Sequence, residues 1–183
     1  MPKQTFIALL RGINVGGNNK LPMKDLAACI EKAGGSKVAT YIQSGNAVFQ
    51  AEASLGPKLA GLIQKAILKS NKIDVPVIIR SAAELRKVAA AHPHNAAGAE
   101  FKALHVGFLA DKPSAAQVAS LDPKRSPEDV FSVKGSEIYV RYSVAGLAKS
   151  KLNNQYIDSK LGTVSTLRNW NTVLKLLEMV SQE

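Results

Sequence analysis

Apolar residues follow two alternating patterns along the chain: short β-branched runs, and longer stretches in which apolar residues recur every three or four positions. Runs such as TFIALLRG and VPVIIRS predict buried strands, and the second pattern predicts helices that bury one side. Glycines and polar clusters separate these segments and predict the turns. The predicted order in the first half is strand 5–12, helix 22–33, strands 38–43 and 46–51, helix 59–67 and strand 75–81.

The same order of elements returns in the second half of the chain, after a predicted linking helix. This half reads as helix 81–91, loop 92–100, strand 103–110, helix 114–121, a hairpin over 129–143, helix 153–161, strand 163–168 and a terminal helix 170–180. Two βαββαβ halves predict an α+β fold made of two ferredoxin-like units, also called α-β plaits. The expected division is residues 1–81, a linking segment 82–102, and residues 103–183 with the C-terminal helix.

This topology brings polar segments together at the edges of the sheets. Right-handed crossovers make strands one and two of each half parallel, and hairpins make strands two and three antiparallel. In the first half, RGINVGGNNK (residues 11–20) should then lie next to QSGN (residues 43–46). In the second half, residues 145–154 should lie beside residues 167–171.

The first of these pairs has the chemistry of an anion site. Gly16 and Gly17 permit a close approach of the backbone, and a helix that begins near Pro22 presents unpaired N–H groups. Alternatively, Asn18, Asn19 or water caps that helix and the glycines only form the turn. The spacing matches neither a P-loop nor a dinucleotide fingerprint. The candidate anion-binding residues here are Arg11, Asn14, Gly16, Gly17, Asn18, Lys20, Gln43, Ser44 and Asn46.

The second pair gathers positive charge near helix starts. Lys149, Lys151 and Arg168 are its basic members, and Asn169, Trp170 and Asn171 complete the candidate set. The alternatives are again structural, because an asparagine is a good N-cap and a tryptophan often packs a helix onto a sheet. The strand motif of an RNA-recognition module is absent, which argues against base recognition by the sheet face.

Net charge favours anionic partners. The chain carries 24 basic and 14 acidic residues, a net charge of +10, although the basic residues form no long run. No stretch reaches the roughly 18 apolar residues of a membrane span, and the N-terminal residues do not resemble a secretory signal. We therefore expect a cytoplasmic protein that does not bind membranes.

Catalytic and metal chemistry find little support. Cys29 is the only cysteine and lies in an apolar helical pattern, and the histidines of HPHN lack a nearby carboxylate cluster, so we expect no metal and no cofactor. Ser44 could be a nucleophile but has no visible base, and no residue can be assigned a catalytic role.

Several blocks together carry a resemblance to a known family. LLRGINVGGNNKLPMKDL, TYIQSGNAVF and TLRNWNTVLKLLEM, with SKLNNQYIDSKLG between them, resemble the signature blocks of a bacterial family catalogued as domain of unknown function number 1697. The resemblance implies paired ferredoxin-like α/β units and marks the glycine loop, the QSGN turn and the RNWN block as the site. It implies no activity, cofactor or partner.

Three functions fit these observations. The leading hypothesis is a monomeric binding protein for a phosphate-bearing partner, with nucleic acid as the main class. The first alternative is a small-molecule enzyme that acts on a phosphorylated or carboxylated metabolite in a cleft between the two units. The second is a protein-interaction module with an exposed apolar patch on the terminal helix.

Overall fold

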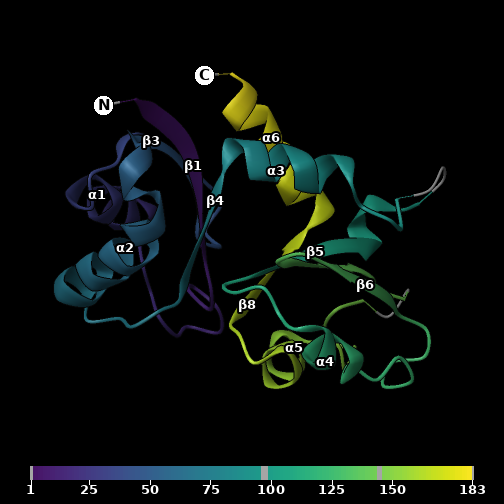
Figure 1. Cartoon of the computed structure of the whole chain (residues 1–183). Coiled ribbons are helices and arrows are strands. Elements are labelled where there is room, and N and C mark those ends of the chain that lie inside the picture. The colour runs from purple at the N-terminus through teal and green to yellow at the C-terminus, as the bar shows by residue number, and fades with distance from the viewer. Residues whose placement is uncertain (1, 96–98, 144–145, 183) are drawn as a thin grey trace. The chain divides into compact units, whose positions relative to one another are not determined.

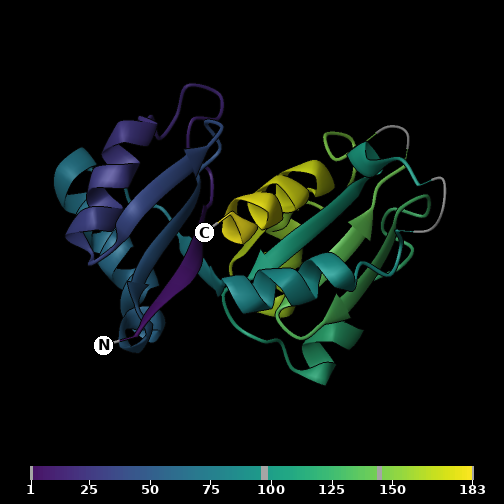
Figure 2. The ribbon, with the colours of Figure 1, turned by 90° about the horizontal axis from the view of Figure 1, so that it is seen from above.

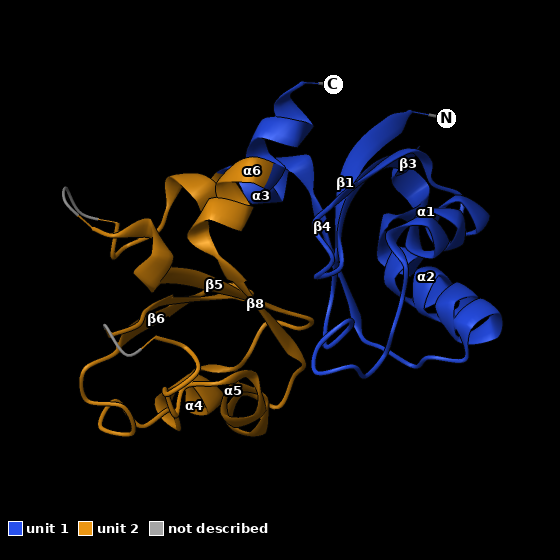
Figure 3. Cartoon of the chain, turned by 180° about the vertical axis from the view of Figure 1, so that it is seen from behind, with its two compact units in different colours: residues 1–86, 176–183 blue, residues 87–175 orange. Residues whose placement is uncertain are grey.

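The computed structural model describes residues 2–95, 99–143 and 146–182 (Figure 1). The chain divides into two compact units: unit 1 contains residues 1–86 and 176–183, and unit 2 contains residues 87–175 (Figure 3). The boundaries pass through two helices, α3 (Ala82–Ala90) and α6 (Trp170–Ser181). The predicted division differs here, because it assigned the whole terminal helix to the second unit.

Unit 1 has one four-stranded sheet. Its elements are β1 (Lys3–Leu10), α1 (Met23–Lys32), β2 (Ser36–Tyr41), β3 (Asn46–Glu52), the 3-10 turn η1 (Ala53–Leu55), α2 (Gly56–Asn71) and β4 (Val77–Ser81), followed by α3. The strand order is β2-β3-β1-β4, and each neighbouring pair is antiparallel. Helices α1 and α2 lie side by side against one face of this sheet (Figure 2).

The core of unit 1 follows from the helical periodicity. Leu26 and Ile30 of α1, with Leu59, Ile63 and Ile67 of α2, are fully buried against apolar residues of β1 and β3. Burying each such side chain contributes about 1.5–3 kcal/mol relative to exposure, so this shared apolar layer fixes both helices on the sheet.

Unit 2 repeats the arrangement. Its elements are η2 (Phe101–Ala103), β5 (Leu104–Leu109), α4 (Ala115–Ala119), β6 (Val130–Lys134), β7 (Glu137–Arg141), α5 (Asn154–Leu161) and β8 (Ser165–Asn169), followed by α6. The strand order is β6-β7-β5-β8, again antiparallel throughout. A core cluster joins the sheet to α5 through Ile138, Val140, Ile157 and Leu161.

The mixed α/β fold predicted from the sequence is confirmed, with two four-stranded antiparallel sheets and six α-helices in the described part of the chain. Strands one and two of each half run in the same direction, because strand three lies between them and pairs antiparallel with both. No helix among the described residues has both the length and the apolar character that crossing a bilayer requires.

Candidate functional site

The two units join their first strand to their hairpin turn in the same way. In unit 1 the N–H of Leu10, at the end of β1, donates to the carbonyl of Gly45 over 2.8 Å. In unit 2 the N–H of Leu109, at the end of β5, donates to the carbonyl of Ser136 over 2.9 Å. The predicted neighbourhood of the first strand's end and the hairpin turn is therefore present in both.

The chain is longer at this position in unit 1 than in unit 2. The connection from β1 to α1 takes twelve residues, 11–22, whereas that from β5 to α4 takes five, 110–114. The hairpin turn takes four residues in unit 1, 42–45, and two in unit 2. We call residues 11–22 and 42–45 the loop end of unit 1.

Asn14 holds the loop end together. Its side-chain amide donates to the carbonyls of Leu21 (2.9 Å) and Gln43 (2.8 Å), and its Oδ1 accepts the N–H of Leu21 over 2.9 Å. One side chain thus joins both arms of the glycine loop to the QSGN turn. Because buried Ile13 and Leu21 anchor the same loop in the core, the loop has a defined shape.

The tip of the loop is a small hairpin of its own. Val15 and Asn18 form a bridge around Gly16 and Gly17, whose φ angles are +58° and +80°. Positive φ at both central residues is the requirement of a tight hairpin turn and favours glycine. A Cβ added at either glycine would meet nothing within 4 Å, so the fold does not pack against the outer side of the turn.

Helix α1 begins beside this loop without a side-chain cap. Its N-cap is Pro22, which has no donor and no capping side chain, and no side chain of the described residues bonds to the free N–H groups there. Neither Asn18 nor Asn19 caps it, since the start of α1 has no side-chain cap bond, and the Asn19 amide donates to the carbonyl of Gly12 over 3.0 Å. Unpaired N–H groups and the positive end of the helix dipole attract anions.

The remaining candidates of the loop end fall into two groups. Lys20 and Asn18 are exposed on the glycine loop. Arg11 is partly buried, and its backbone N–H donates to the carbonyl of Pro76. Asn46 is fully buried, and its amide donates to Ser44 Oγ (2.9 Å) and to the Tyr41 carbonyl (3.2 Å). Asn46 therefore holds the turn in shape.

Arg168 does not lie on the surface as the sequence suggested. It is 7% exposed, and its Nη1 donates to Thr166 Oγ1 (2.7 Å) and to the Leu167 carbonyl (3.0 Å). Burial lowers the pKa of its guanidinium to about 10. A side chain enclosed in this way cannot reach out to a phosphate in solution.

The neighbouring RNWN residues begin α6. Asn169 accepts the N–H of Asn171 over 3.0 Å and donates to the Lys102 carbonyl, so it serves as the helix cap. Trp170 is 1% exposed and packs its ring perpendicular to His92, with centroids 4.7 Å apart. These are the structural alternatives that the sequence left open for this block.

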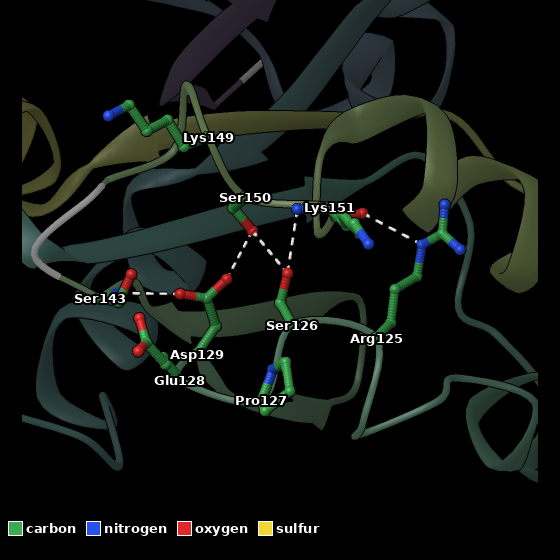
Figure 4. A pocket seen from close by; sticks show the side chains of 9 residues that line it. All are labelled: Arg125, Ser126, Pro127, Glu128, Asp129, Ser143, Lys149, Ser150 and Lys151. Carbon is green, nitrogen blue, oxygen red and sulfur yellow. Dashed lines mark hydrogen bonds between the residues drawn. The ribbon is translucent and has the colours of Figure 1, made fainter.

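Lys149 and Lys151 belong to a different place in unit 2. Both line a pocket of about 390 Å³ whose other lining residues are 125–129, Ser143 and Ser150 (Figure 4). Leu167 packs in the core cluster on the helical face of the sheet, and successive strand residues point to opposite faces, so Arg168 lies on the other face. Arg168 is therefore not among the residues that line this pocket with the two lysines.

The polar centre of this pocket is Asp129, which the sequence did not single out. Asp129 is 8% exposed, and its carboxylate accepts hydrogen bonds from the N–H of Ser143 (2.8 Å) and the hydroxyl of Ser150 (2.5 Å). Ser126 Oγ lies 3.4 Å from Ser150 Oγ, whereas the side chain of Lys149 extends away from this cluster (Figure 4).

Two further expectations concern metals and apolar patches. Among the residues that the structure describes, no group of three His, Cys, Asp or Glu side chains could hold a metal ion. The exposed large apolar side chains of the described residues do not lie on α6, where the protein-interaction alternative expected them. They are Val15, Ile42, Leu62, Leu68, Phe101 and Val130.

Comparison with known proteins identifies the family. The family model described as "Protein of unknown function (DUF1697)" matches residues 3–139, more than half of the chain. The chain belongs to the DUF1697 family. The matched range contains the whole loop end of unit 1, and it stops before the pocket lysines and the RNWN block of this DUF1697 protein.

A solved structure supports the fold of this DUF1697 protein. The conserved bacterial protein SP0830 from Streptococcus pneumoniae superimposes with a TM-score of 0.74 and 22% sequence identity. The similarity covers 97% of this chain and 99% of that one. No curated protein sequence matches the chain.

Proposed function

We propose that this protein binds a phosphate-bearing partner at the loop end of unit 1, with nucleic acid as the leading class. The observation that carries the proposal is the twelve-residue connection 11–22, which is held in shape by Asn14 and lies where unit 2 needs only five residues. A preshaped segment longer than the fold requires, with an outer side that nothing packs against, is typical of a binding loop.

The chemistry of the loop end supports a phosphate group. The glycine turn allows close approach to the backbone, the first turn of α1 offers N–H donors, and Lys20 adds a positive charge on the exposed side of the loop. The net charge of +10 would attract such a partner from a distance and would make binding salt-dependent. A cytoplasmic location, where such partners are abundant, is part of the proposal.

We also propose that each unit is a ferredoxin-like unit. The support is the strand order, which reads 4-1-3-2 in both sheets when each set of strands is numbered from its own start, with one helix after the first strand and one after the third.

A second candidate is a small-molecule enzyme, favoured by the buried carboxylate of Asp129 in the pocket of unit 2. A polar pocket that contains a buried acid is where such chemistry is usually found. However, both carboxylate oxygens already accept hydrogen bonds from Ser143 and Ser150, and a substrate would have to compete with them.

The proposal is tested by fluorescence anisotropy with short labelled nucleic acids, in competition with inorganic pyrophosphate. Lys20→Gln should weaken binding about fivefold at near-physiological salt, as expected for one lost phosphate contact. The matched control is Lys112→Gln, which removes an exposed lysine from the equivalent connection of unit 2.

The three possible results of this experiment distinguish a specific phosphate site from diffuse attraction and from no binding. Weaker binding by Lys20→Gln alone, with displacement by pyrophosphate, supports the loop end as a phosphate site. Equal weakening by both substitutions means diffuse attraction to a basic surface. No binding of nucleic acid or pyrophosphate by the unmodified protein contradicts the proposal and turns attention to the pocket of unit 2.

A further inference from the structure

Helix α2 carries a row of lysines on its outer face. Lys58, Lys65 and Lys69 follow at steps of seven and four residues, which place them on one side of the helix, and Lys72 comes directly after the helix as its left-handed C-cap. All four are exposed, and the helical part of the row, from Lys58 to Lys69, is about 16.5 Å long at 1.5 Å per residue. We call these four residues the lysine row.

The lysine row is not balanced by acidic residues. The 16 residues of α2 include no aspartate or glutamate, and none of the four ammonium groups forms an ion pair with a described residue. The nearby Asp74 accepts a hydrogen bond from Gln64 instead, over 2.8 Å. The corresponding helix of unit 2, α5, contains both Asp158 and Lys160.

The fold gains little from this arrangement. Like charges four residues apart, as at Lys65 and Lys69, destabilise a helix, and Lys58 lies in the first turn, where a positive charge opposes the helix dipole. Only Lys69 and Lys72, near the C-terminal end, have a favourable position. A row that costs stability indicates a role in binding.

The surroundings of the row select the type of partner. A membrane surface fits poorly, because the apolar face of α2, with Leu59, Ile63 and Ile67, is buried in the core and cannot enter lipid. Unpaired bases fit poorly as well, because α2 has no aromatic side chain on which they could stack. A straight row of exposed ammonium groups on a rigid helix matches the regular phosphates of a duplex backbone.

The row ends close to the loop end. The side chain of Asn71, next to Lys72, donates to the carboxylate of Asp25 in the first turn of α1 over 2.9 Å. The C-terminal end of α2 therefore adjoins the start of the helix that follows the glycine loop. Both surfaces belong to unit 1, and Figure 2 shows α1 and α2 side by side.

We infer that the lysine row binds the phosphate backbone of a nucleic-acid duplex, which extends along α2 toward the loop end. This inference rests on the proposed function and names the partner as double-stranded. The loop end would take one phosphate group, and the row would contact successive phosphates without reading sequence.

The experiment is an anisotropy titration of a labelled RNA or DNA duplex over a range of salt concentrations. The test variant is Lys65→Gln/Lys69→Gln, and the control is Lys124→Gln/Lys160→Gln, which removes the same charge from exposed positions of unit 2. Circular dichroism should show that all variants remain folded, since every substituted side chain is exposed.

The test variant should bind about 30-fold more weakly at near-physiological salt, and the slope of log affinity against log salt should fall by about 2. The control should lose no more than about twofold, through long-range charge alone. Equal losses in the two variants overturn the inference, as does tighter binding of single strands than of duplexes.

Failure of the inference can be told from failure of the proposed function. If the lysine-row variant binds normally while Lys20→Gln binds more weakly, the proposed phosphate site at the loop end is supported and the inference about the lysine row is contradicted. If the unmodified protein binds neither duplex nor single strand, both fall together.

Discussion

The first connection of each unit occupies the same topological position but differs in length and in the capping of the helix that follows. In unit 2 a five-residue connection ends in a complete capping box, in which Ser114 Oγ accepts the N–H of Gln117 and the Gln117 side chain accepts the N–H of Ser114. In unit 1 a twelve-residue connection leads to a helix with no side-chain cap. In unit 2, side-chain caps accept N–H groups at the start of α4, whereas in unit 1 no side chain caps the N–H groups at the start of α1.

The comparison shows which part of the loop end the fold needs. A five-residue connection is enough to close this sheet-to-helix crossover, so the additional residues of unit 1 are not required by the topology. They are nevertheless held firmly by Asn14 and by buried Ile13 and Leu21. Order that the topology does not require supports our proposal that this loop binds a ligand.

The largest expected effect separates the packed glycine from the open ones. In Gly45→Ala the new Cβ would lie 2.7 Å from the Leu10 Cβ at a φ of +78°, so we expect a loss of about 3–4 kcal/mol in the free energy of unfolding. Gly17→Ala meets only open space and should lose about 1 kcal/mol through its positive φ. Urea denaturation of both variants measures the difference, and equal losses would mean that the turn is not packed as described.

The second effect is a pH dependence that belongs to unit 2, since all three histidines lie there. His92 is buried and neutral: its Nε2 lies 3.2 Å from the His105 carbonyl, and its Nδ1 accepts the N–H of His94. Desolvation lowers the pKa of His92 to about 4, and burial also lowers the pKa of His94 and of His105.

The direction of this pH dependence follows from the number of protons that the folded and unfolded chains bind. Between pH 6.5 and about 4, His92 is protonated in the unfolded chain but stays neutral in the folded chain. The contribution of His92 to the free energy of unfolding is therefore fully present above pH 6.5 and is lost as the pH falls toward 4. We expect His92 to contribute a loss of about 3 kcal/mol over that window. Thermal melts from pH 7 to 4 measure it, with His92→Gln as the comparison. A pH profile that is unchanged by this substitution would assign the loss to other groups.

The third effect compares the side-chain hydrogen bonds of the first connection in unit 1 with those in unit 2. Asn14→Ala removes three hydrogen bonds and leaves the Leu21 N–H without its acceptor, so we expect a loss of about 2–3 kcal/mol. Ser114→Ala removes a helix cap in unit 2 and should lose about 1 kcal/mol. Only Asn14→Ala should also weaken phosphate binding. If Ser114→Ala weakens it equally, the difference between the two connections has no functional meaning.

Much of the fold could be predicted from the sequence, because strands and helices leave distinct periodicities. The neighbourhood of the glycine loop and the QSGN turn followed from strand directions alone, and the contact between Asn14 and Gln43 agrees with it. The hydrogen bonds by which Asn14 joins the glycine loop to the QSGN turn could not be predicted, because any of the loop's asparagines could have formed them.

The second site was misjudged for a physical reason. The pattern TVSTLR is too short and too uniform to show which face each residue takes, so buried Arg168 was grouped with surface lysines. The lysine row was missed because its members are spread over α2 and form no continuous run. Only Lys65 falls within the predicted helix 59–67, so the signal, a spacing of seven and four residues between Lys58, Lys65 and Lys69, becomes visible only when the helix is extended to its observed bounds.

The most direct test of the central claim is a titration of ¹⁵N-labelled protein with a short nucleic-acid duplex, followed by amide chemical shifts. We expect the amides of Gly16, Gly17, Lys20 and the first turn of α1 to shift most, together with those on the exposed side of α2. The amides of residues 110–114 of unit 2 should stay unchanged. Shifts confined to unit 2, or spread evenly over both units, would contradict it.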